Sequence, residues 1–216
     1  MPPRETVASK PEAAARKTST PTRDHLIEVG LELMRKHGYG ATGLQDILKS
    51  AQIPKGSFYH HFGSKEEFTD AVLERYVTLS GNYCSKVLGN TRQAPLKRLR
   101  RYFEDLIQLA GQSSAIPGCL AGTLSLEVAA ASPLLQRRLS SGFAQWQSLV
   151  ASVLREAMEK GDLPKSVKPE PLAGFLLNSW EGSLLRSQAD QSDAPLRDFL
   201  TYIFDEVLAE NSYTRH

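Results

Sequence analysis

The chain of 216 residues lacks several features that mark particular classes of protein. No apolar run approaches the roughly 20 residues needed to cross a bilayer. Only two cysteines occur, Cys84 and Cys119, with no CxxC pair or Cys/His cluster of the kind that binds structural zinc. The net charge is only +2, so any contact with a polyanion must be local. We therefore expect a cytoplasmic protein with reduced thiols, no membrane contact, no metal and no cofactor.

The first twenty residues differ in composition from the rest. Residues 1–20 are rich in Pro, Ala, Ser, Thr, Lys and Arg, and they contain almost no large apolar side chain. They also lack the apolar stretch of a secretory signal. This composition favours a disordered N-terminal tail, because it offers too little apolar surface to bury.

The segment that follows has the pattern of consecutive helices. LIEVGLELMRKHG has apolar residues at helical spacing and ends in glycine. Thr42 and Gln45 have the spacing of a capping box for a second helix. Pro54 ends that helix and is well placed to begin a third, KGSFYHH. Ser64 and Glu67 form another capping box, which opens a longer fourth helix.

The third of these helices combines two different faces. It is too short and too polar to be stable alone, so we expect Phe58 and Phe62 to anchor it in the core. Its other face is then free, as in a helix-turn-helix, whose second helix enters the major groove of DNA. Lysines can neutralise phosphates there, and hydroxyls and helix-start amides can donate to phosphate oxygens. The expected DNA contacts are Thr42, Gly43, Lys55, Gly56, Ser57, Tyr59, His60 and Lys65.

A known family shares this pattern. Residues 22–68 closely resemble the N-terminal DNA-binding domain of the TetR family of bacterial transcriptional regulators. The resemblance is carried by GYxxTGLQDIL at 38–48, AxIPKGSFYHHF at 51–62 and SKEEF at 64–68. It implies an all-α protein of about nine or ten helices that binds a palindromic operator as a homodimer, and it leaves repressor and activator open. The domains are then a DNA-binding domain at 21–68 and a ligand-binding and dimerisation domain at 69–216.

The second domain also has a helical pattern. APLKRLRRYFEDLIQLA is amphipathic, and residues 118–131 are nearly all small and apolar, so we expect them to be buried. A long helix follows Ser132-Pro133 and runs to Gly161. The resemblance implies that the last two long helices, at about 168–189 and 195–210, form the dimer interface, and a share from 133–160 stays open.

Three groups in this domain suggest a small-molecule site. Cys119 enters an apolar helix, where nearby amides would lower the thiol pKa, or it is simply a small buried hydrophobe. Glu127 stands among Leu, Val and Ala and needs a partner. Arg186 follows Trp180 and Glu181, and it either binds a carboxylate effector or forms a structural pair. The expected effector-pocket residues are Phe103, Cys119, Leu120, Glu127, Trp146, Trp180, Glu181 and Arg186.

A narrower resemblance concerns the possible effector. The string GCLAGTLSLEV…WEGSLLRS is similar to a subgroup of TetR-type repressors that respond to reactive electrophiles and small unsaturated acids. This subgroup includes the N-ethylmaleimide reductase repressor and the acrylate-responsive repressor. Gln188 stands where the first of these has a lysine, which argues against thiol–lysine chemistry.

A second class of function competes with this one. A helical binding protein or enzyme could use Glu127, Trp180, Glu181 and Arg186 as a site. Against catalysis, no Ser/His/Asp or metal-ligand constellation occurs outside the DNA-binding window. We therefore expect a regulator and no enzyme activity.

Overall fold

The computed structural model describes residues 21–111 and 118–209, and these residues form helices and connecting turns without a strand. The expected tail at 1–20 lies outside the described residues. The N-terminal helices are α1 (Pro21–His37), α2 (Leu44–Ala51), α3 (Lys55–His61) and α4 (Lys65–Leu88). Five α-helices and a π-helical turn follow: α5 (Pro95–Gly111), α6 (Leu120–Val128), α7 (Pro133–Lys160), α8 (Pro169–Asp190), α9 (Ala194–Thr201) and η1 (Tyr202–Val207).

The first three helices pack around aromatic side chains. Phe58 is 0% exposed and Phe62 is 1% exposed, so the two expected anchors of α3 are confirmed. Their rings lie 5.4 Å apart, and both contact the ring of Phe68 from α4. A Cβ at Gly30 of α1 would lie 2.3 Å from Phe68 Cζ, so only glycine permits this close crossing of α1 and α4. Each buried phenylalanine stabilises the domain by about 1.5–3 kcal/mol.

The helix caps agree with the sequence at α4 and differ at α2. Ser64 accepts a 3.0 Å hydrogen bond from the Glu67 amide, as expected of its capping box. At α2 the expected Thr42–Gln45 box is wrong, because Gly43 is the N-cap and its amide donates to Asp46 Oδ2 at 3.0 Å. Capping boxes are ambiguous by one residue when acceptors stand at neighbouring positions.

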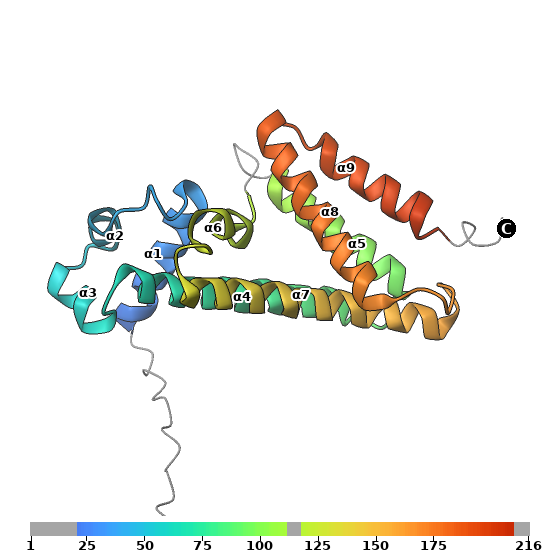
Figure 1. The fold of residues 1–216 in the computed structure, drawn as a ribbon, viewed down its shortest axis with the longest axis horizontal. Helices are drawn as coiled ribbons and strands as arrows, with labels where there is room; N and C mark the ends of the chain where they lie inside the picture. The colour runs from blue at the N-terminus through green and yellow to red at the C-terminus, as the bar shows by residue number, and fades with distance from the viewer. Residues whose placement is uncertain (1–20, 112–117, 210–216) are drawn as a thin grey trace, which may run out of the picture.

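Two long helices connect the ends of the molecule (Figure 1). α4 and α7 lie side by side, with α1–α3 at one end and α5, α8 and α9 at the other, while α6 lies between them. Arg138 of α7 donates to both carboxylate oxygens of Asp70 of α4, at 2.8 and 3.0 Å. Since α4 begins beside α1–α3 and continues without a break, a movement of α4 or α7 would displace residues at both ends.

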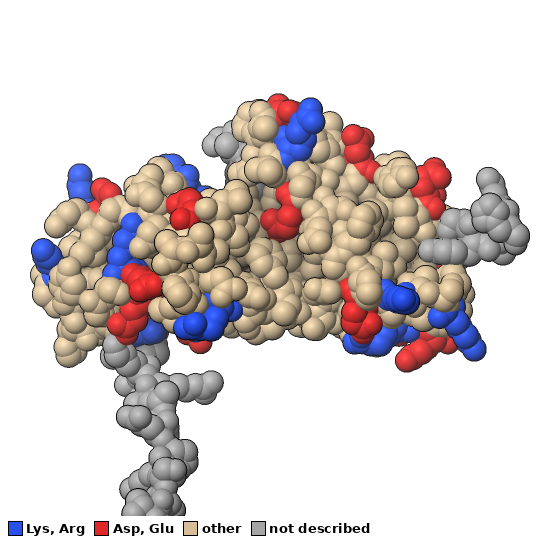
Figure 2. All heavy atoms as spheres, in the orientation of Figure 1, with Lys and Arg blue, Asp and Glu red and all other residues tan. Residues whose placement is uncertain are grey.

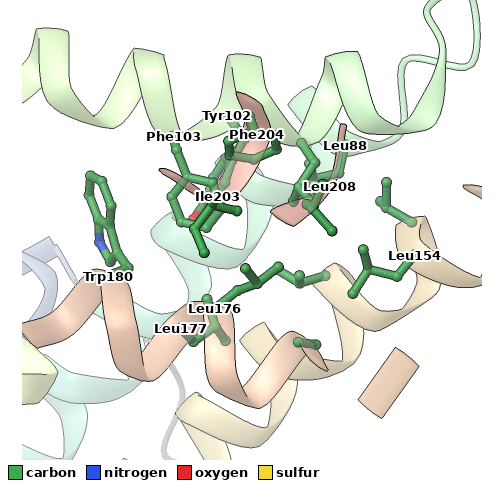
Figure 3. Packing of buried hydrophobic residues seen from close by; sticks show 14 of the residues in the cluster. Leu88, Tyr102, Phe103, Leu154, Leu176, Leu177, Trp180, Ile203, Phe204 and Leu208 are labelled. Carbon is green, nitrogen blue, oxygen red and sulfur yellow. The ribbon is translucent and has the colours of Figure 1, made fainter. Parts of the chain in front are cut away.

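The core of the second domain is aromatic (Figure 3). Phe103 of α5 is fully buried, with its ring 5.1 Å from Trp180 of α8 and 5.0 Å from Phe199 of α9. The other labelled side chains belong to the same apolar cluster and come from α4, α5, α7, α8, η1 and the residue that follows it: Leu88, Tyr102, Leu154, Leu176, Leu177, Ile203, Phe204 and Leu208. Phe103 and Trp180 therefore serve mainly as core residues.

Helix α6 corrects one expectation of burial. Its inner side is buried at Leu120, Leu124 and Val128, but Leu126 is 82% exposed and Glu127 is also exposed. Because small apolar residues occur on every side of α6, the sequence did not indicate which side faces solvent. The expected burial of all of 118–131 is therefore wrong for the outer side of this helix.

Two findings concern other kinds of site. Within 21–111 and 118–209, no helix is long and apolar enough to cross a bilayer. The same residues contain no group of three or more His, Cys, Asp or Glu side chains placed to hold a metal ion.

Candidate DNA-binding surface and effector site

The outward side of α3 forms the candidate DNA-binding surface. Pro54 precedes the helix in extended conformation, and burial of Phe58 turns the opposite side outward. Lys55, Gly56, Tyr59 and His60 are exposed, and Ser57 is half-buried. A Cβ at Gly56 would meet nothing within 4 Å, so this position leaves room for another molecule to approach the backbone.

The outward side of α3 is charged at only a few positions. The Lys55 ammonium lies 5.9 Å from the centre of the Tyr59 ring, and Tyr59 is 50% exposed. On the face shown in Figure 2, Lys and Arg side chains are interspersed with Asp and Glu and form no single large basic patch. A polyanion would therefore be bound by a few placed groups rather than by a general field.

Two of the expected DNA contacts are engaged inside the protein. Thr42 is 1% exposed, and its hydroxyl donates to the Gly38 carbonyl at 2.6 Å. Lys65 Nζ donates to the Tyr39 carbonyl at 2.6 Å and lies 4.0 Å from the centre of the Tyr39 ring. Burial lowers the pKa of Lys65, while the nearby Glu127 carboxylate acts in the opposite direction. Both side chains stabilise the α1–α2 turn in this conformation, and their contact with DNA stays a prediction.

The candidate effector site is centred on the Cys119 thiol. Cys119 is the N-cap of α6, and its Sγ accepts a hydrogen bond from the Gly122 amide at 3.4 Å. The Tyr76 hydroxyl of α4 lies 3.4 Å from the same sulfur. Glu181 of α8 reaches the same turn, because a Cβ at Gly122 would lie 2.7 Å from Glu181 Oε2 and 3.6 Å from Cys119 Cβ. The site therefore joins α4, α6 and α8 around one partly exposed cysteine.

The electrostatics of this site differ from the expectation. Burial, followed by the neighbouring Glu181 charge, raises the pKa of Cys119 to about 12, against the smaller opposite effects of Tyr76 and the Gly122 amide. The expected lowering of the thiol pKa at a helix N-terminus is therefore wrong. Burial also raises the pKa of Glu181, and its Oε1 has no hydrogen-bond partner among the described residues.

The remaining residues expected in the effector pocket lie in different parts of the structure. Trp146 is partly buried beside Tyr102, with the ring centres 6.5 Å apart, and Leu120 is buried in the packing between α6 and the DNA-binding end. Arg186 is not in the pocket, because its side chain is 70% exposed and pairs with Asp190 at 2.7 Å. The expected carboxylate-binding role of Arg186 is corrected by this outward orientation.

Glu127 is also outside the pocket. Its Oε2 accepts a 2.7 Å hydrogen bond from the Gly40 amide, in the turn between α1 and α2. Gly38 lies against the same carboxylate, and a Cβ there would be 2.2 Å from Glu127 Oε1. The expected buried effector ligand is instead an exposed contact between α6 and the DNA-binding end.

Comparisons with known proteins match both the N-terminal and the C-terminal part of the chain. The family described as "Bacterial regulatory proteins, tetR family" matches residues 26–72, and "Tetracyclin repressor-like, C-terminal domain" matches residues 95–203. The HTH-type transcriptional repressor DhaR of Mycobacterium sp. strain GP1 is 36% identical over 88% of this chain and 93% of its own length. The chain belongs to the TetR family.

Two further relatives support this family assignment. The transcriptional regulator AcuR of Cereibacter sphaeroides is 34% identical over 81% of this chain and 80% of its own length. The crystal structure of reduced NemR from Escherichia coli has a TM-score of 0.81 and 31% identity, over 86% of this chain and 96% of that structure. This TetR-family chain is therefore a transcriptional regulator with an N-terminal helix-turn-helix and a C-terminal helical domain.

Sequence reasoning missed one member of the candidate effector site in this TetR-family protein. Tyr76 is 43 residues away from Cys119 and lies in the part of α4 beyond the SKEEF motif, where the sequence carries no further motif. Gln188, which was noted beside the family resemblance, has its side-chain amide against Gly118. The short WEGSLLRSQ stretch of α8 thus contacts the start of α6 through Glu181 and Gln188, while Arg186 faces away.

Proposed function

We propose that the chain is a repressor that binds a palindromic operator as a homodimer and is released by a small effector. The exposed side of α3 is the observation that carries this proposal. Lys55, Gly56, Tyr59 and His60 stand together on a helix of the right kind to enter a major groove. The similarity to proteins named transcriptional repressors supports the direction of control. Such a regulator acts in the cytoplasm, at the nucleoid when it is bound to its operator.

The dimer is assigned to the outer side of α8 and η1. Phe175 and Leu185 are 56% and 61% exposed, and with Asn178, Gly182 and Ala189 they form one outward stripe along α8. Tyr202 of η1 is 67% exposed. Exposed apolar side chains in one stripe are typical of a surface that another chain covers. Two α3 helices must then reach successive major grooves, about 34–36 Å apart.

The effector site is assigned to Cys119 and the groups around it. An electrophile that adds to the thiol would push apart α4, α6 and α8, which meet there. Changing a regulator from mostly bound to mostly free requires roughly 5 kcal/mol of preference for one shape. A covalent bond supplies this preference without a limit set by ligand dissociation. A small carboxylate is less well supported, because Arg186 faces solvent.

Fluorescence anisotropy on DNA upstream of the protein's own gene tests the proposal. Methyl vinyl ketone would be added, with the saturated analogue butanone as its unreactive control. Release by methyl vinyl ketone alone, abolished in Cys119→Ser, supports a covalent effector. Release by both compounds would replace it with a non-covalent pocket. Failure to bind the upstream DNA or any selected palindromic DNA would overturn the repressor assignment itself.

A further inference from the structure

The Cys119 thiol sits between hydrogen-bond donors and an acceptor. The Gly122 amide donates to Sγ at 3.4 Å, and the Tyr76 hydroxyl lies at the same distance. The remaining neighbour, Glu181, brings its carboxyl group to the same turn of α6, and a carboxylate can accept the S–H proton. With the proton directed to Glu181, the Tyr76 O–H is free to donate to sulfur, so two donors and one base surround the thiol.

Glu181 is held in place for this contact. Its Oε2 lies 2.7 Å from the position of a Cβ at Gly122, so the carboxyl group packs directly on the first turn of α6. Its Oε1 is buried, and no described residue donates a hydrogen bond to it. An unpartnered buried carboxylate oxygen is costly, and it is retained where a proton or a ligand group will occupy it.

The charges that face this cluster are nearly all negative or neutral. Tyr76 and Glu181 come from α4 and α8, and the neutral amide of Gln188 lies against Gly118. Arg35 of α1 acts on Tyr76 only as the weakest of its electrostatic influences. Arg186 pairs with Asp190 in solvent, so it is not placed to balance an anionic ligand here.

We propose that Glu181 accepts the Cys119 proton when the sulfur adds to a neutral α,β-unsaturated carbonyl compound. This inference rests on the proposed covalent response of the regulator. The S–H bond breaks and its proton moves to the Glu181 carboxylate, while a C–S bond forms at the β-carbon of the compound. The π electrons move onto the carbonyl oxygen as an enolate. Glu181 then returns the proton to the α-carbon, so the atoms and electrons balance without another reactant.

The surroundings of the thiol explain why a base is needed. With a pKa of about 12, the thiol is almost entirely protonated near pH 7. Only about one molecule in 10⁵ carries the reactive thiolate at that pH. Removing the proton during the addition avoids this rare state, and the Gly122 and Tyr76 donors stabilise charge on sulfur as it develops.

The same geometry assigns the class of effector. A compound with its own carboxylate would bring a second negative charge beside Glu181 in a partly buried site. Neutral aldehydes, ketones, amides and esters carry no such penalty. Acrylamide and acrylate make a matched pair of probes, since they have the same size and differ in charge at neutral pH.

The experiment measures the rate at which Cys119 is alkylated in the full-length protein. A Cys84→Ala background leaves one thiol, and intact mass spectrometry counts adducts from pH 6 to 9. Rates with acrylamide and acrylate are each divided by the rate with free N-acetylcysteine, which removes their intrinsic difference in reactivity. Glu181→Gln keeps the shape of the side chain and removes the base, and Glu181→Asp keeps a base with a shorter reach.

In the parent protein we expect little change in rate between pH 7 and 9. We expect Glu181→Gln to react at least tenfold more slowly at pH 7 and to gain nearly tenfold per pH unit. The rate of Glu181→Asp should lie between those of the parent and Glu181→Gln. The normalised rate with acrylamide should exceed that with acrylate at least tenfold. A faster Glu181→Gln variant would mean that Glu181 only suppresses the thiolate, which overturns the proposal. Equal normalised rates for the two probes would overturn the assigned effector class.

Two readouts separate this proposal from the proposed function. Circular dichroism and operator affinity of unreacted Glu181→Gln check that the variant is folded. Alkylation is scored by mass, independently of operator release. Adducts that form with Glu181 dependence but leave the operator bound would refute the covalent effector response and retain Glu181 as the base.

Discussion

The Gly40 amide donates a 2.7 Å hydrogen bond to Glu127 Oε2, and this contact joins α6 to the turn between α1 and α2. The same α6 begins at Cys119, where α4 and α8 also meet. One nine-residue helix therefore has the proposed effector site at its start and a contact with the α1–α2 turn at its end. A shift of α6 would therefore act directly on Gly40 through this hydrogen bond.

We expect Glu127→Ala to weaken this connection. An exposed hydrogen bond to a carboxylate is worth about 1 kcal/mol, which corresponds to about fivefold in an equilibrium constant. The ratio of operator affinities before and after treatment with methyl vinyl ketone should therefore fall by about fivefold in anisotropy titrations. Glu159→Ala, an exposed charge on α7, is the matched control. An unchanged ratio in Glu127→Ala would show that the contact does not transmit the response.

Gly38→Ala tests the same contact from the other side. Gly38 has a φ of +76°, and its Cβ would lie 2.2 Å from Glu127 Oε1. The substitution should displace the carboxylate and cost about 1 kcal/mol or more of stability through the positive φ. In the double variant with Glu127→Ala, the loss of coupling should not add, because both changes remove one interaction. Additive losses in the anisotropy titrations would mean that the two residues act separately.

The DNA-binding surface makes a second prediction. We expect Lys55→Ala and Tyr59→Ala to lower operator affinity by at least tenfold while the melting temperature stays within about 2 °C, since both side chains are exposed. Loss of the Lys55 charge should also reduce the slope of log affinity against log salt by about 1. Lys165→Ala, an exposed lysine in the turn between α7 and α8, should change neither quantity. Normal binding by both α3 variants would refute the assignment of this surface.

The α8 stripe makes a third prediction. We expect Phe175→Asp and Leu185→Asp to yield monomers in size-exclusion chromatography with light scattering, because each puts a charge into an apolar interface. The monomers should bind a two-site operator much more weakly. Leu126→Asp is the matched control, since Leu126 is 82% exposed on α6 and outside the stripe. Dimers in both α8 variants would place the interface elsewhere.

Local signals predicted much of the fold. KGSFYHH predicted α3 with its observed bounds, because proline, a short polar helix and two phenylalanines leave few alternatives. Ser64 was recognised as a cap from Glu67 three residues later, and the pair Ser132-Pro133 marked the start of α7. The exposure of Lys55, Gly56, Tyr59 and His60 could be predicted from the burial of Phe58 alone. These features depend on contacts within a few residues, which a sequence pattern can express.

The effector site was less predictable for a physical reason. Which side of α6 and α8 faces inward depends on where α4 and α7 lie, and both helices are apolar on several sides. Glu127 and Arg186 were therefore assigned to the pocket although both face outward. Glu181 was assigned correctly to the region, but Tyr76 was missed because its contact spans 43 residues. The sign of the Cys119 pKa shift followed from burial, which the apolar composition of residues 118–131 had predicted and which outweighs the amides at the helix start.

The raised pKa of Cys119 makes a last prediction, about stability. The folded thiol has a pKa of about 12 against an ordinary value of 9.0. Below pH 9 both folded and unfolded thiols are protonated, so the contribution of the thiol to stability is complete. Between pH 9 and 12 the unfolded chain loses the proton while the folded chain keeps it, so stability falls. At pH 10 the loss is about 1 kcal/mol, or about 2–4 °C in melting temperature.

Thermal melts of the parent protein and Cys119→Ala at pH 8 and pH 10, at one protein concentration, measure this loss. The parent should lose about 2–4 °C relative to the variant between the two pH values. Cys84→Ala is an informative companion, because burial raises the pKa of Cys84 to about 11 and predicts a loss of the same sign. Burial is the largest cause of the raised pKa values of Tyr76 and Tyr102, so their contribution persists in all three proteins and largely cancels. A pH-independent difference between parent and Cys119→Ala would mean that the folded thiol titrates near its ordinary value, and the need for Glu181 as a base would then disappear.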